Sequence, residues 1–76
     1  MNLFIFEIGM YKYAVAAANY DIAERIIQGV GQGFSGFRTI PVRDLKKSQA
    51  RKYASVIGNP EEVYVQNENT NEWELV

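Results

Sequence analysis

Two stretches of alternating side chains near the N-terminus, residues 2–8 and 12–18, constrain the fold more than any other feature of the sequence. Successive side chains of a strand point to opposite faces, so each stretch predicts a β-strand. Gly9, Met10 and Tyr11 lie between the stretches, which is the length of a hairpin loop in which glycine can adopt a positive φ. We therefore predict an N-terminal β-hairpin. The alternative is one long strand bent by a bulge at Gly9.

The apolar spacing then changes to that of a helix. Apolar residues recur along one helical face at Ile22, Ala23, Ile26, Ile27 and Val30. Asn19 is placed to cap the helix, Asp21 and Glu24 put negative charge in its first turn, and Gly29 is a C-terminal stop. This segment predicts the first helix of the fold.

The middle of the chain predicts a strand and a second helix. Residues 37–42 form a short strand, and Pro41 restricts it to the edge of a sheet or ends it. Asp44 can cap a second helix that runs to about Ile57. Its expected core residues are Leu45, Tyr53, Ala54 and Ile57, with Ala50 beside them.

The Gly-Asn-Pro sequence at residues 58–60 is expected to end the second helix. Two short strands are then predicted at residues 63–65 and 73–76. A polar turn joins them into a C-terminal hairpin. The predicted order is therefore ββαβαββ in one domain, residues 1–76. We expect the α+β class, with a small, mostly antiparallel sheet and both helices on one face.

Missing residue types exclude much of enzyme chemistry. The chain has no cysteine and no histidine, so zinc sites of the Cys/His kind, thiol catalysis and a Ser-His-Asp triad are excluded. Small secreted domains usually need disulfides, so the composition favours a cytoplasmic protein. No apolar run reaches the eighteen residues of a membrane span. We expect a protein that is not an enzyme, has no cofactor and has no membrane association.

Charge is distributed unevenly along the chain. Six of the eight cations lie within fifteen residues, at Arg38, Arg43, Lys46, Lys47, Arg51 and Lys52. The C-terminal segment carries Glu61, Glu62, Glu68, Glu72 and Glu74 and no cation. On a continuous helix over residues 43–53, Arg43, Lys47 and Arg51 would stack on one exposed face because they are four residues apart.

The basic helix has four interpretations. It is simply solvated or neutralised by the glutamates of the same molecule, it binds nucleic acid, or it binds an acidic protein. The complementary halves of the molecule also allow a homodimer. Phe34 and Phe37 would add loop aromatics to the contact surface, and Tyr11, Tyr20 and Trp73 are also expected to be partly exposed.

Residues 29–36 form a glycine-rich loop that contains G-x-G-x-x-G. The dinucleotide fingerprint needs this motif between a strand and a helix, and here it follows a helix and precedes a strand, so a Rossmann site is rejected. Backbone N–H groups of consecutive glycines can still bind an anion. A small phosphorylated ligand or nucleotide is therefore a further candidate, held by Gly31, Gly33, Ser35, Gly36 and Arg38. The alternative is a flexible connector whose phenylalanines enter the core.

Two pairs of carboxylates are candidate metal ligands: Glu61 with Glu62, and Glu72 with Glu74. A magnesium site would need another carboxylate or a substrate phosphate, so no metal site is predicted. The sequence thus favours a non-catalytic interaction or regulatory module that binds another macromolecule through the basic helix and the loop aromatics. A nucleic-acid binder and a binder of a small phosphorylated ligand are the alternatives.

Overall fold

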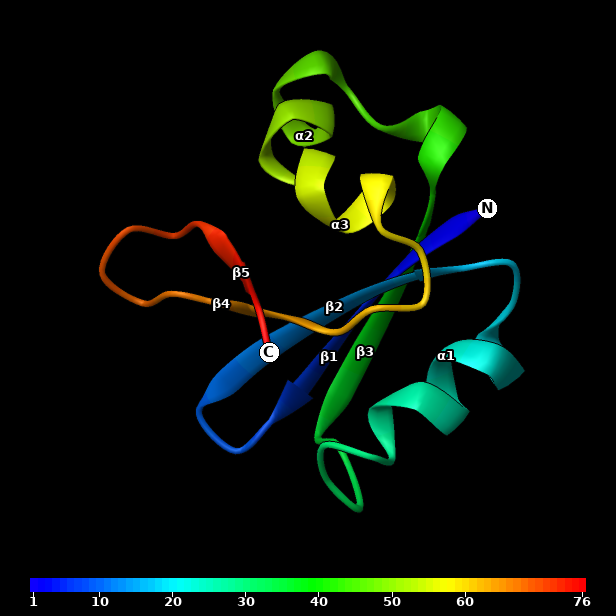
Figure 1. The fold of residues 1–76 in the computed structure, drawn as a ribbon, viewed down its shortest axis with the longest axis vertical. Helices are drawn as coiled ribbons and strands as arrows, with labels where there is room; N and C mark the ends of the chain where they lie inside the picture. The colour runs from blue at the N-terminus through cyan, green and yellow to red at the C-terminus, as the bar shows by residue number, and fades with distance from the viewer.

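A computed structural model describes all 76 residues. Its five strands form one antiparallel sheet in the order β3-β1-β2-β4-β5, which confirms the α+β class (Figure 1). No helix is long and apolar enough to cross a membrane. The elements are β1 (Asn2–Ile8), β2 (Tyr11–Ala17), α1 (Tyr20–Ile27), β3 (Gly36–Pro41), the 3₁₀ turn η1 (Val42–Asp44), α2 (Lys47–Lys52), α3 (Ala54–Gly58), β4 (Tyr64–Gln66) and β5 (Trp73–Leu75).

The predicted N-terminal hairpin is confirmed. β1 and β2 pair in full, from Asn2 opposite Ala17 to Ile8 opposite Tyr11, across a two-residue loop. Gly9, the first loop residue, has φ 60°, which suits a two-residue hairpin turn that needs positive φ at its first position. β3 pairs with β1 at the edge of the sheet, as Pro41 predicted.

Two hydrophobic cores lie on opposite faces of the sheet, so the prediction that both helices cover one face is wrong. Phe4 and Phe6 point toward α1 and pack with its Ala23 and Ile27. The alternate residues of β1 pack with the α2–α3 side in a second core, which consists of Leu3, Ile5, Ala14, Ala16, Tyr53, Val56, Tyr64 and Trp73. Figure 1 shows α1 and the α2–α3 pair on either side of the sheet. The alternation of apolar residues on both faces of β1 leaves two surfaces to cover, and one helical layer covers each.

The first helix has the predicted cap and apolar face, but it ends at Ile27, so Val30 lies outside it and is exposed. The side chain of Asn19 accepts a hydrogen bond from the Ile22 N–H at 3.0 Å, which caps α1. The helix buries Ala23 and Ile27 and ends before Gly29. Local signals alone therefore define both ends of α1.

The predicted second helix is broken into three short pieces. Asp44 lies in η1 and does not cap the helix, and α2 begins only at Lys47, where Gln49 Oε1 accepts from the Lys46 N–H. Tyr53 leaves the helical conformation, with φ −102° and ψ 14°, and separates α2 from α3. The break rotates the following turn, so that Val56 is buried and Ala54 is exposed, the reverse of a continuous helix.

Candidate functional site

Four of the six predicted cations gather around α2. Lys46 is the residue before the helix, and Lys47, Arg51 and Lys52 belong to it. All four residues are exposed. We call these four residues the α2 surface. The structure contains a single ion pair, from Arg43 Nε to Asp44 Oδ1 at 3.8 Å, so no cation of the α2 surface is neutralised within the molecule.

Arg43 is separated from this surface, because the helix does not extend back to it. It lies in η1, next to Val42, whose N–H donates to the carbonyl of Met1. Its side chain is 87% exposed. The predicted line of Arg43, Lys47 and Arg51 along one helix is therefore wrong, since only the last two share a helix.

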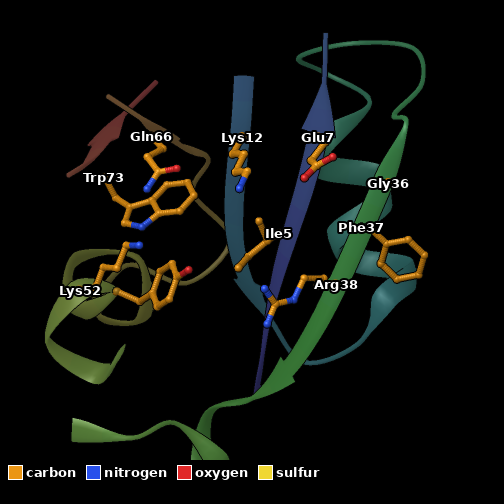
Figure 2. Close-up of a pocket in the computed structure, with 10 residues that line it drawn as sticks. Ile5, Glu7, Lys12, Gly36, Phe37, Arg38, Lys52, Gln66 and Trp73 are labelled. Carbon is orange, nitrogen blue, oxygen red and sulfur yellow. The ribbon is translucent and has the colours of Figure 1, made fainter. Parts of the chain in front are cut away.

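Arg38 lies on β3, on the same face of the sheet as α2 and α3. It stands opposite Ile5, a residue of the α2–α3 core. There it borders a cavity of about 330 Å³, which we call the sheet pocket. Figure 2 shows Lys12, Arg38 and Lys52 directed from different sides toward the space over Ile5. The pocket is lined by Ile5, Glu7, Lys12, Gly36, Phe37, Arg38, Lys52, Tyr53, Gln66 and Trp73.

The two loop aromatics point away from the cations. Phe37 stands opposite Phe6, on the α1 face, and Figure 2 shows its ring turned away from the sheet pocket. Phe34 packs edge-on against Phe6 at 4.9 Å between ring centroids, and Phe37 lies 5.0 Å from Tyr20. Phe37 is still 49% exposed. The structure thus places the predicted aromatic and cationic contact residues on opposite faces of the sheet.

Trp73 was expected to be partly exposed, and this prediction is wrong. Only 8% of the residue is exposed, and its ring lies 5.4 Å from that of Tyr53. Its indole Nε1 is buried and has no hydrogen-bond partner, which is unusual for a buried donor. Tyr11 is exposed as expected, and Tyr20 and Phe34 are half-buried.

Six pocket residues were not predicted as site residues: Ile5, Glu7, Lys12, Tyr53, Gln66 and Trp73. The hairpin register was a usable signal for two of them, because it pairs Glu7 with Lys12 near the loop end. Tyr53 was expected in the core, which the structure confirms, and burial raises its pKa, an effect that the nearby positive charge of Arg38 opposes. Nothing in the sequence indicates that β3, α2 and β5 converge on one cavity.

The glycine-rich loop does not gather the residues proposed for an anion site. Gly31 and Gly33 border a depression of about 440 Å³ whose only charged lining residue is Glu24. Ser35 instead binds the carbonyl of Glu7 through both its backbone N–H, at 2.8 Å, and its hydroxyl, at 3.3 Å. Gly36 and Arg38 belong to the sheet pocket. The carboxylate of Glu24 makes the loop depression a poor site for a phosphate.

The acidic C-terminal segment comes close to the α2 surface at one point. Glu72 borders a depression together with Arg51 and Lys52, although no ion pair joins them. No three acidic side chains lie together in the geometry of a metal site.

Comparisons with protein-family models, curated proteins and solved structures gave no match, so function is inferred from this geometry alone.

Proposed function

We propose that this protein is a non-catalytic interaction module that binds an acidic protein through the α2 surface. The observation that supports the proposal is the absence of any intramolecular ion pair to the four cations of this surface. A partner's carboxylates can therefore pair with them without breaking an existing contact. Long-range attraction between opposite charges also accelerates encounter and weakens as salt increases.

Glu72 favours a protein over a nucleic acid as the partner. It borders the same depression as Arg51 and Lys52, so a bound surface must accommodate a carboxylate between cations. A protein can place a cation opposite Glu72 and carboxylates opposite its neighbours. A nucleic-acid backbone presents only negative charge, and Glu72 would repel it.

A second copy of the chain is one possible source of the acidic surface. Its five C-terminal glutamates are complementary to the α2 surface, and this supports a homodimer as a second candidate. The cysteine-free composition supports a cytoplasmic site of action. The absence of histidine and cysteine supports a binding role over a catalytic one.

Capture of partners from a lysate by the immobilised protein tests the proposal, with the double variant Lys47→Glu, Arg51→Glu. We expect the variant to lose most of the captured protein, because two of the four surface charges are reversed. Arg25→Glu on α1 is the matched control, since it reverses an exposed cation on the other face of the sheet, and it should capture normally. Equal capture by the double variant and the wild type would refute the proposal.

Two further measurements separate the alternatives. Nuclease treatment should leave the captured material in place, and its release would indicate nucleic acid. Fluorescence anisotropy with labelled DNA and RNA at roughly 50 and 200 mM salt checks this directly, because phosphate contacts weaken steeply over that range. Light scattering at the same salt concentrations detects a homodimer. A circular-dichroism melt of each variant verifies that the fold is retained.

A further inference from the structure

The sheet pocket concentrates positive charge around an apolar floor. Lys12, Arg38 and Lys52 enter it from three different elements, and Glu7 is its only carboxylate, which leaves the lining side chains with a formal charge of +2. None of the four charged groups is in an ion pair. Two strands and a helix thus bring three cations to one cavity, and the only carboxylate there, that of Glu7, is in no ion pair with any of them.

One residue of the pocket lining, Trp73, carries a hydrogen-bond donor that lacks an acceptor. The indole Nε1 of Trp73 is buried and has no hydrogen-bond partner, and only 8% of the residue is exposed. Figure 2 shows the ammonium of Lys52 on the same side of the indole as this nitrogen. Lys52 also lies over the ring of Tyr53, 5.8 Å from its centroid. A ligand oxygen in this part of the pocket would supply the acceptor that the indole N–H lacks.

The remaining walls suit the organic part of a small molecule. Ile5 and the Tyr53–Trp73 pair, whose rings are tilted by 38°, provide apolar surface beside the cations. The volume of about 330 Å³ lies at the lower end of the range for small-molecule sites, which is about 300–1,000 Å³. Gln66, on the opposite side from Arg38, adds an amide that can bind a polar substituent.

We propose that the sheet pocket binds a phosphate monoester of a small, ring-bearing molecule. The charge of such an ester near pH 7 is about −1.5 to −2, which matches the formal +2 of the lining. Arg38 presents the planar fork that binds two phosphate oxygens, and Lys12 and Lys52 supply point charges. The Trp73 N–H, which has no acceptor in the protein, donates to a ligand oxygen, and the ring of the ligand lies against the apolar wall. The site overlaps the proposed partner surface only at Lys52.

The single tryptophan makes the test direct, because its indole N–H gives one cross-peak in a ¹H–¹⁵N spectrum. The full-length protein is titrated with AMP, phenyl phosphate and inorganic phosphate, with sodium chloride as the ionic-strength control. We expect a saturable downfield shift of the indole proton with the esters and none with chloride. AMP and phenyl phosphate distinguish a nucleotide from an aryl phosphate as the source of the phosphate group.

Arg38→Gln should weaken ester binding by about tenfold, because it removes a charged fork from the phosphate. Arg43→Gln is the matched control and should bind within about twofold of the wild type, because Arg43 lies outside the pocket. The absence of a saturable shift up to roughly 10 mM ester, or an unchanged affinity in Arg38→Gln, would overturn the proposal. Equal affinity for inorganic phosphate and both esters would show that the ring adds nothing to binding, and would overturn the proposal that the ligand bears a ring.

The two proposals can fail separately. The double variant Lys47→Glu, Arg51→Glu removes the partner surface and leaves every residue of the sheet pocket unchanged. It should therefore still bind the ester, although less tightly at low salt because of the altered net charge. Loss of protein capture with retained ester binding supports both proposals. Normal capture by this variant, together with ester binding that Arg38→Gln weakens, refutes only the partner surface.

Discussion

Tyr53 is the residue at which the core meets the sheet pocket. Tyr53 belongs to the α2–α3 core, packs its ring against that of Trp73 and is only 8% exposed, and it also lines the cavity. Burial raises the pKa of the Tyr53 hydroxyl above its usual value of 10.0, and the positive charge of Arg38 partly opposes this rise. The neutral phenol is therefore the form that the fold favours.

This preference predicts a loss of stability at alkaline pH. The pKa of Tyr53 is higher in the folded than in the unfolded chain, so its contribution to stability is complete below pH 10, the ordinary value. It decreases as pH rises from there through the folded pKa, because the unfolded chain releases the proton first. Urea unfolding at pH 8, 10 and 11 measures the effect. Tyr53→Phe should flatten the decrease, and an equally steep decrease in this variant would assign it to other groups.

Trp73 shows why single residues are hard to place from sequence. It begins a strand of three residues near the C-terminus, where an aromatic side chain is expected to be partly exposed. Its burial depends on Tyr53, which lies twenty residues earlier and reaches it only when α2 and β5 dock on the same face. Packing between segments distant in sequence leaves no local pattern, so the pocket formed by these residues was not predictable.

At the scale of the elements, the cap of α1 gives a testable stability difference. The Oδ1 atom of Asn19 accepts from the Ile22 N–H, and removal of an N-cap side chain typically costs about 1 kcal/mol, within a range of about 0.5–2 kcal/mol. Asn19→Ala should therefore lower the free energy of unfolding by that amount in urea titrations. Asn69→Ala in the exposed C-terminal turn is the matched control and should change it by less than about 0.5 kcal/mol. An equal effect of the two substitutions would contradict the capping role.

Local sequence signals predict α1 correctly but do not predict the break in the second helical segment. In α1 the cap, the apolar face and the glycine stop all lie within eleven residues and agree with one another. Between residues 44 and 58 no apolar side chain from Lys46 to Gln49 holds the first turn on the sheet. The buried residues Tyr53 and Val56 decide the local conformation instead, and the helix breaks at Tyr53. Tertiary packing has overridden the helical pattern here.

The arrangement of layers was predictable in part. The hairpins, the edge position of β3 and the antiparallel sheet follow from alternation, turn residues and Pro41. The two-sided covering of the sheet was missed, although the apolar residues on both faces of β1, such as Ile5 and Phe6, are visible in the sequence. That alternation without a polar face is a sequence signal for a sheet that is covered on both sides.

At the scale of the whole molecule, the two cores are joined through the same strands. β1 and β2 provide side chains to both, for example Ile5 to the α2–α3 core and Phe6 to the α1 core. A domain of this length is stabilised by only about 4–11 kcal/mol, and neither core would leave the shared strands ordered if the other were lost. We therefore expect the molecule to unfold as one cooperative unit.

Phe6→Leu tests this cooperativity from the side that does not contain the tryptophan. Phe6 is fully buried in the α1 core, and its replacement by a smaller apolar residue should cost about 1–2 kcal/mol. In a domain of this size each 1 kcal/mol lowers Tm by about 4–8 °C. Fluorescence of Trp73, which lies in the α2–α3 core, should report the same decrease as far-UV circular dichroism, because the shared strands transmit the loss. Val56→Ala in the α2–α3 core should likewise move both transitions together. If Phe6→Leu lowered the circular-dichroism transition and left the Trp73 transition at its wild-type temperature, the two cores would be separate folding units.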